Sequence, residues 1–163
     1  MFINVEYDRE AAVLYAERWA HSRNPRFLDF DGLGGDCTNF VSQCIYAGCK
    51  VMNYTRVFGW YYKTAGDRSA AWTGVSFLHD FLVGNEGAGP YAAVGNQAEL
   101  KPGDIVQLGD GTGKFYHSLV AAEVHSGEIY VAAHTFDAFM RPLSSYDYGE
   151  ARFLHIAGYR KQV

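Results

Sequence analysis

Apolar residues recur at helical spacing in three segments of the first half of the chain. The pattern predicts helices over residues 8–21, 36–48 and Val75–Val83. Asp8 is placed to cap the first helix, Asn24-Pro25 closes it, and Gly48 is expected to stop the second. The positions predicted to face inward are Ala12, Tyr15, Trp19, Phe40, Val41, Cys44, Ile45, Phe77, Leu78, Phe81 and Leu82.

Apolar runs separated by turn signals characterise the second half. They predict strands over residues 105–108, 116–124, 129–134 and 152–160. Ser126-Gly127 is expected to join the middle two as a hairpin. Residues 50–72 are aromatic and irregular, and 84–99 is expected to be a glycine-rich loop. Helices followed by an antiparallel sheet predict an α+β fold.

Length and charge narrow the class of protein. The 163 residues fit one domain, residues 1–163, and the net charge of −4 offers no basic surface for nucleic acid. No segment reaches the roughly 18 apolar residues of a membrane span. The N-terminus lacks the basic and apolar regions of a signal peptide. The chain as written is therefore expected in the cytoplasm, or outside the cell if it is a domain of a longer secreted protein.

The stretch GGDCTNFVSQC, residues 34–44, places a cysteine where the second predicted helix begins. Free amide donors and the positive end of the helix dipole favour a thiolate there. Gly34 and Gly35 let the backbone enter the helix tightly and leave room for a substrate. Asp36 is expected to cap the helix or orient its backbone. Cys37 is therefore the candidate nucleophile, and its amide is a candidate oxyanion donor.

Two of the six histidines are candidate partners for this thiol. His117 opens one predicted hairpin strand and His134 closes the next. In an antiparallel hairpin these two ends meet at the same edge of the sheet. We expect one imidazole to act as general base to Cys37 while the other orients it.

The other two cysteines do not suggest a metal site or a disulfide. Cys37 and Cys44 are seven residues apart on the predicted helix, about 10 Å along its axis, which is too far for a disulfide. The spacing C-x₆-C-x₄-C converges poorly on one zinc ion. Cys44 and Cys49 are expected to be bystanders, and no metal or cofactor is predicted.

The chain resembles the putative amidase domain family, within the papain-like superfamily of NlpC-type and CHAP-type cell-wall peptidases. The resemblance spans nearly the whole chain, and its blocks are YDREAAVLYAERWAHSRNP, GGDCTNFVSQCIYAG, AAWTGVSFLHDFL, LKPGDIVQL, YHSLVAAE and AAHTFDAFMRPLS. It implies a papain-like fold, with Cys37 as nucleophile and His117 as base. His134 would be the third member of the triad, Asp137 is the alternative, and Glu123 fits less well.

Several other residues are candidates for supporting roles. Asn39 and Ser42 are expected either to contact substrate or to be polar-face residues of the helix. Trp72, like Trp60, Tyr61 and Tyr62, is expected either to wall the cleft or to pack in the core.

The leading hypothesis for function is a cysteine hydrolase that cleaves an amide through a thioester. By resemblance, its substrate is a peptide or a related amide of the bacterial cell wall. An acyltransferase would use the same residues with an amine acceptor. A binding module for glycan or peptide, without catalysis, is the alternative from another class.

Overall fold

The structure, a computed structural model, describes all residues 1–163 and contains one main sheet and four α-helices. The helices are α1 Arg9–Trp19, α2 Cys37–Cys49, α3 Ala70–Thr73 and α4 Val75–Gly84, with short 3₁₀ helices at Gln97–Glu99 and Leu143–Ser145. The strands are β1 Phe2–Val5, β2 Tyr62–Thr64, β3 Asp67–Arg68, β4 Gly89–Gly95, β5 Ile105–Gly109, β6 Phe115–His125, β7 Glu128–Ala133, β8 Ala138–Pro142 and β9 Glu150–Gln162.

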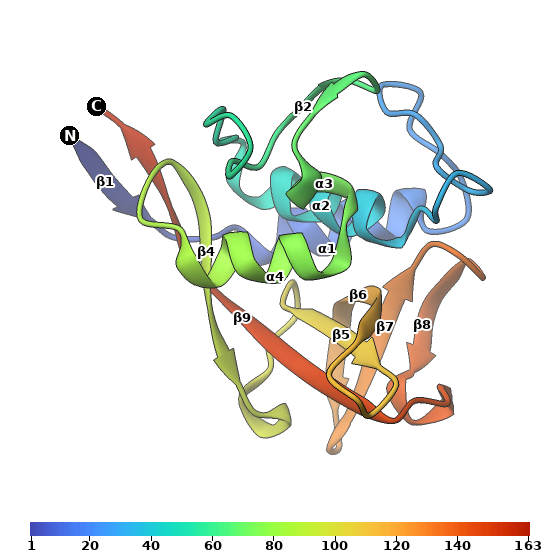
Figure 1. Cartoon of the computed structure of the whole chain (residues 1–163). Helices are drawn as coiled ribbons and strands as arrows, with labels where there is room; N and C mark the ends of the chain where they lie inside the picture. Colours follow the sequence, from blue (N-terminus) through green and yellow to red (C-terminus); the bar gives the residue numbers. More distant parts are fainter.

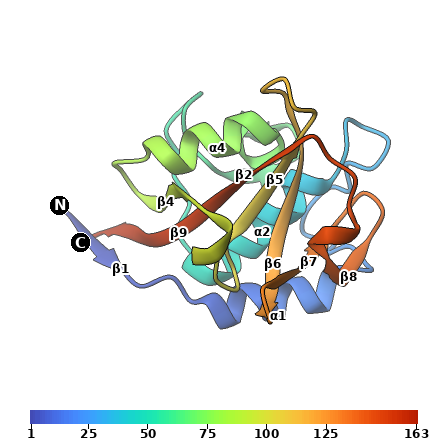
Figure 2. The same cartoon turned by 90° about the horizontal axis from the view of Figure 1, so that it is seen from below.

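All strand pairs of the main sheet are antiparallel, in the order β1-β9-β5-β6-β7-β8, with β4 also pairing β9. Helices α1, α2 and α4 cover one face of this sheet (Figure 1). The view from below shows the N- and C-termini side by side, where β1 pairs the end of β9 (Figure 2). The α+β class predicted from the sequence is therefore confirmed.

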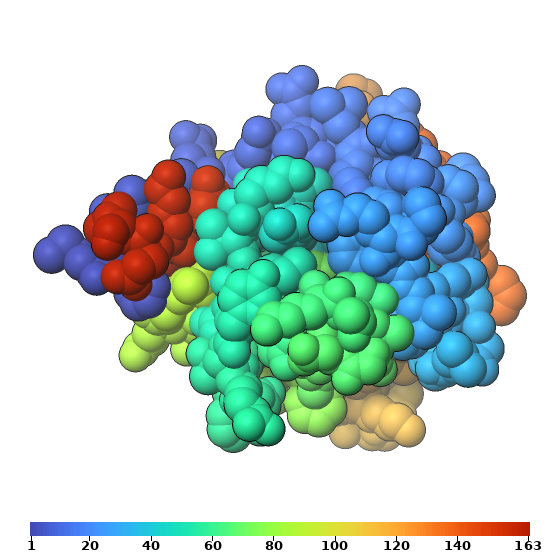
Figure 3. All heavy atoms as spheres, turned by 90° about the horizontal axis from the view of Figure 1, so that it is seen from above, coloured from blue at the N-terminus to red at the C-terminus, as the bar shows by residue number.

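Two hydrophobic clusters lie on the two sides of the sheet. The larger cluster fills the space between the helices and the sheet and includes Phe40, Val120 and Ala132. The smaller cluster takes alternate positions of the same strands, such as Leu119 and Val131, and is covered by Leu143. On the outer helical side, the segments between α1 and α2 and between α2 and α3 form much of the surface (Figure 3). The molecule has no helix long and apolar enough to cross a membrane.

The three predicted helices are present, with two corrections inside them. Asp8 caps α1 by accepting a hydrogen bond from the amide of Ala11 at 3.0 Å. Gly48 does not stop α2, which continues to Cys49 and ends on a left-handed Lys50. Its missing side chain serves a close approach instead, because a Cβ there would lie 2.4 Å from the Tyr7 ring. Phe77 is wrong as a core residue, since it is 61% exposed on α4.

The four predicted strands are confirmed as β5, β6, β7 and β9, and the region predicted as a loop at 84–99 is wrong in part. Residues Gly89–Gly95 form β4, which pairs with β9. The strand was not predicted because its glycines and Pro90 have low strand propensity when the segment is considered without its partner. Pairing along β9 supplies the backbone hydrogen bonds that the local sequence does not predict.

A β-bulge in the hairpin of β6 and β7 decides which residues share a face. The register pairs Glu123 with Tyr130 but Ala121 with Val131, so Ala122 is the extra residue. Since side chains alternate between faces, one extra residue moves every side chain beyond it to the other face. Continued along the strands, this register sets His134 opposite Ser118 rather than on the face of His117.

Candidate active site

The candidate nucleophile occupies the position that its sequence predicts. Cys37 is the first residue of α2 and is 8% exposed. Gly34 and Gly35, just before it, have φ angles of 101° and 100°, a region that favours glycine. The amide of Cys37 donates no hydrogen bond within the protein, as expected at a helix start. It is therefore free to meet a negatively charged oxygen.

Opposing effects act on the Cys37 thiol. Burial raises its pKa above the ordinary value, and the charge of Asp36 adds to that rise. The backbone N–H of Ser118 and the hydroxyl and N–H of Thr38 act in the other direction, by hydrogen bonding to sulfur. The Thr38 hydroxyl lies 3.7 Å from Sγ. Because the net pKa is raised, the thiol is protonated at neutral pH and needs a base to become a nucleophile.

His117 is joined through the backbone to a residue that binds the neighbour of Cys37. It immediately precedes Ser118, whose hydroxyl lies 2.9 Å from that of Thr38. Its backbone lies opposite Leu108 in the register of β5 and β6, and its ring lies 6.1 Å from that of Tyr146 between centroids, on the face of the smaller cluster. Neither ring nitrogen makes a hydrogen bond within the protein. Burial, with a smaller contribution from the charge of Arg141, lowers the pKa of His117 to about 4, so the ring is neutral at neutral pH.

His134 lies on the opposite face from His117, which corrects the expectation that one imidazole orients the other. The His134 ring stacks on Phe40 of α2 with centroids 4.0 Å apart. Its Nδ1 lies 2.5 Å from Asp36 Oδ2, and its Nε2 lies 2.7 Å from the carbonyl oxygen of Trp19. Nδ1 thus faces an oxygen acceptor, whereas Nε2 lies near both that carbonyl oxygen and Arg23 Nη1, which is 3.2 Å away. The bulge at Ala122 is the physical reason, because without it the two imidazoles would share a face.

Asp36 anchors the start of α2 without capping it. Its position is the N-cap, but its side chain makes no capping bond to the helix. The carboxylate instead accepts hydrogen bonds from the amide of Phe30 at 2.8 Å, from Asn39 Nδ2 at 2.9 Å and from His134. Burial alone would raise the pKa of Asp36, yet these hydrogen bonds hold it below the usual value. The residue before the candidate nucleophile is therefore a buried carboxylate held in place by three hydrogen bonds.

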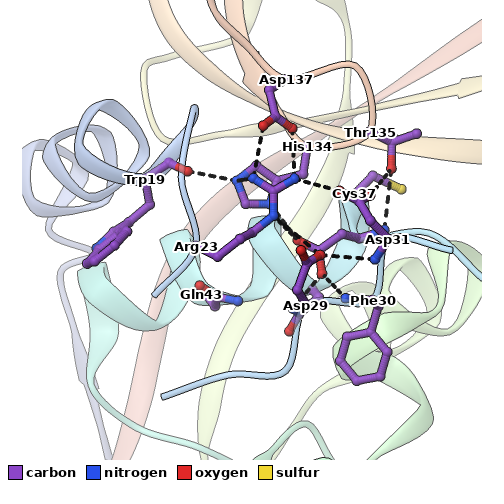
Figure 4. Close-up of polar contacts among 12 residues, drawn as sticks. Trp19, Arg23, Asp29, Phe30, Asp31, Cys37, Gln43, His134, Thr135 and Asp137 are labelled. Atoms are coloured by element: carbon purple, nitrogen blue, oxygen red, sulfur yellow. Dashed lines mark hydrogen bonds and ion pairs between the residues drawn. The ribbon is translucent and has the colours of Figure 1, made fainter. Parts of the chain in front are cut away.

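Arg23 extends this network toward solvent. Its guanidinium lies among several carboxylates and close to His134 (Figure 4). It donates to Asp31 at 2.6 Å and to both oxygens of Asp137 at 2.9 and 3.0 Å. Asp137, the alternative third member of the triad, is thus paired with Arg23 and not with His117. In the same view the Cys37 sulfur points away from this cluster, toward Thr135.

The remaining predicted neighbours hold the helix in the core. Asn39 donates to the carbonyl of Leu28 at 3.0 Å and accepts from Trp72 Nε1 at 3.0 Å. Ser42 donates to the carbonyl of Trp72 at 2.9 Å and accepts from Trp60 Nε1 at 3.0 Å. Both tryptophans are fully buried, so Trp72 packs in the core and does not wall a cleft. Cys44 and Cys49 are buried free thiols, in keeping with their expected role as bystanders.

Three residues of the site were missed in the sequence. Thr38 and Ser118 follow the two candidates directly, and their hydroxyls lie 2.9 Å apart between α2 and β6. A serine inside the apolar run HSLVAAEV was the available signal for one of them. Arg23 was harder to identify, since its only signal in the sequence is the set of aspartates in the nearby segment DFDGLGGD, which would favour a cationic partner.

Neither of two surface cavities, of about 500 and 610 Å³, includes the candidate residues. The first is lined by Phe58, Phe77 and Asn85 among others, and the second by Val94, Phe153 and His155. The candidate site is therefore defined by the contacts of Cys37 and not by either of these two cavities.

The fold and the site define an α+β protein with a buried thiol at a helix start, packed on an antiparallel sheet. Residues 6–157 match the family described as "Putative amidase domain", and the chain belongs to this family. The chain is also 34% identical over 140 residues to the "Uncharacterized protein YhbB" of Bacillus subtilis (strain 168). That match covers 83% of this chain and 44% of the relative, so the chain spans less than half of the relative's length. No solved structure matches the chain.

Proposed function

We propose that this protein hydrolyses an amide bond by nucleophilic attack of Cys37, with His117 as general base. The membership of an amidase family supports the reaction class. The observation that carries the mechanism is the thiol of Cys37 at the first residue of α2, 3.7 Å from Thr38 Oγ1, which in turn lies 2.9 Å from the hydroxyl of Ser118, the residue after His117. We infer that the fold is of the papain-like, NlpC type, in which this order of helix and strand recurs.

The proposed reaction begins with a neutral thiol and a neutral imidazole. His117 removes the proton from Cys37 as sulfur attacks the carbonyl carbon, and the free amide of Cys37 donates to the oxyanion. The protonated imidazole then gives its proton to the leaving amine. Water, deprotonated by His117, releases the acyl group from the thioester. The His117 ring lies beside Tyr146 on the sheet face of the smaller cluster, so the proposal requires that the side chain turn toward sulfur when substrate binds.

His134 and Asp36 have a positioning role in this proposal. They fix the start of α2 through a buried pair and leave the proton transfers to Cys37 and His117. The substrate that we propose is a peptide amide of the bacterial cell wall. Its support is the likeness of the sequence blocks to cell-wall peptidases.

The proposed function is tested by trapping its covalent intermediate. A mixture of cell-wall peptides should leave an acyl adduct on the protein after a rapid acid quench, detected by intact mass. Tryptic peptide 27–50 carries all three cysteines, so fragment ions must locate the adduct. We expect it on Cys37 alone. Turnover with an adduct on another residue, or turnover that persists when Cys37 is alkylated, would contradict the proposal.

The lowered pKa of His117 predicts that the rise of kcat/KM on the acid side of its pH profile occurs at an unusually low pH. The base must be neutral, so kcat/KM should rise with pH around 4 and not around the ordinary histidine value near 6.5. Removing a nearby positive charge raises the pKa of an imidazole, so Arg141→Gln should move the limb to higher pH. The measurement is kcat/KM from about pH 3 to 8 for both proteins, over the range where each stays folded. A limb near 6.5 that Arg141→Gln leaves in place would exclude His117.

A further inference from the structure

A chain of buried polar side chains runs from the Cys37 thiol into the sheet. Thr38 Oγ1 lies 3.7 Å from Cys37 Sγ and 2.9 Å from Ser118 Oγ. Ser118 Oγ lies 3.1 Å from Gln107 Nε2, and Gln107 Oε1 lies 2.8 Å from Arg152 Nε. Thr38, Ser118 and Gln107 are at most 1% exposed. We call these three residues the relay.

The far end of the relay fixes the direction of its hydrogen bonds. The Arg152 guanidinium can only donate, so the Gln107 atom that faces it must be the oxygen. The same amide faces the carbonyl of Val75 at 2.9 Å, which can only accept, so the atom there must be the nitrogen. Two independent contacts therefore set the orientation of Gln107, and its Nε2 donates to Ser118 Oγ.

The donor in each of the remaining hydrogen bonds, from Ser118 to Cys37, then follows by elimination. With Gln107 donating to it, Ser118 has Thr38 Oγ1 as the acceptor for its own hydrogen. Thr38 in turn has Cys37 Sγ as the acceptor for its hydrogen. If Thr38 pointed back at Ser118, the Ser118 hydrogen would be buried without an acceptor. A buried donor without a partner is costly, so a single direction satisfies every group.

We propose that Gln107, Ser118 and Thr38 are positioning residues that hold the Thr38 hydroxyl as a fixed donor to the sulfur of Cys37, and so favour the thiolate. This inference rests on the proposed function for its use in catalysis. The donor is set before the reaction begins and needs no reorganisation as negative charge forms on sulfur. It offsets part of the burial that holds the thiol protonated, in the same direction as the N–H of Ser118.

The charged groups around the helix start must stay in place in any test of this proposal. They are Asp36, with Arg23 from the segment after α1, His134 after β7, His117 from β6 and Arg152 at the far end of the relay. The substitutions used below change none of them.

The test is the pH dependence of Cys37 alkylation by limiting iodoacetamide, with the label located by fragment ions. Thr38→Val keeps the shape and removes the donor, and it should raise the midpoint of the profile by about one pH unit. The rate well below the midpoint then falls about tenfold, while the rate at high pH is unchanged. Thr38→Ser restores a hydroxyl and should restore the midpoint. Ser69→Ala, a buried serine that binds Tyr61, is the matched control and should leave it unchanged.

Two outcomes would contradict the proposed role of the relay. One is an unchanged midpoint in Thr38→Val, and the other is a midpoint in Thr38→Ser as high as in Thr38→Val. If Thr38→Val does not fold, Thr38→Ala decides, because it also removes the hydroxyl that donates to sulfur and should raise the midpoint in the same way. Alkylation requires no turnover. Full turnover by Cys37→Ala would therefore defeat the proposed function and leave the result on the thiol standing, so the two failures are distinguishable.

Discussion

Cys37→Ala is expected to lower kcat/KM for amide hydrolysis by at least about 10³-fold. The variant removes the sulfur that forms the thioester in the proposed mechanism, and neither of the other thiols is placed to replace it. Cys44 lies fully buried about two helical turns away, and burial raises the pKa of both Cys44 and Cys49, the latter to about 12. The measurement is the initial rate of product release from the cell-wall peptide mixture, at equal concentration of folded protein.

The matched control is Cys49→Ala, at the other end of the same helix. Cys49 donates weakly to the carbonyl of Val51 at 3.5 Å and contacts no candidate residue, so its variant should keep wild-type turnover. His117→Gln should lose about 10² to 10⁴-fold. Combined with Cys37→Ala it should lose little more, because residues that act in one step are not additive. A His117→Gln enzyme with nearly full rate would move the role of base elsewhere.

The sequence predicted that a helix begins at the candidate nucleophile, because that start depends on local chemistry. Two glycines, an aspartate and an apolar run specify a tight entry into a helix, and the structure begins α2 at Cys37. The same local reasoning predicted the hairpin of β6 and β7. It also placed the ends of both strands, and hence His117 and His134, at one edge of the sheet.

What the sequence did not predict depends on long-range packing. The bulge at Ala122 leaves no clear mark in the run LVAAEV, yet it sends His134 to the face of α2 and into contact with Asp36. Strand β4 was missed because its partner, β9, begins more than fifty residues later. Arg23 was missed because its partners come from separate segments that meet only in the folded chain.

Asp36→Ala is expected to lower the free energy of unfolding by at least about 3 kcal/mol, because each buried donor left without an acceptor costs about 1–3 kcal/mol. The carboxylate is fully buried and accepts from Phe30, Asn39 and His134, so its removal leaves three donors without an acceptor. Asp137→Asn, which alters the exposed partner of Arg23, should cost at most about 1 kcal/mol. Urea unfolding at neutral pH measures both, and equal losses would contradict the assignment of Asp36 as the anchor.

The pH dependence of this loss of stability distinguishes the charge of the Asp36 carboxylate from the shape of its side chain. The pKa of Asp36 is held below its usual value near 3.8, so between the two values the unfolded chain binds the proton more readily than the folded protein. The stabilisation by this carboxylate is therefore fully present above about pH 4 and is lost as the pH falls through the folded pKa. Asp36→Asn keeps the shape but has no such titration. The difference in unfolding free energy between wild type and Asp36→Asn should therefore shrink on acidification, whereas a purely steric role for Asp36 would keep that difference constant with pH.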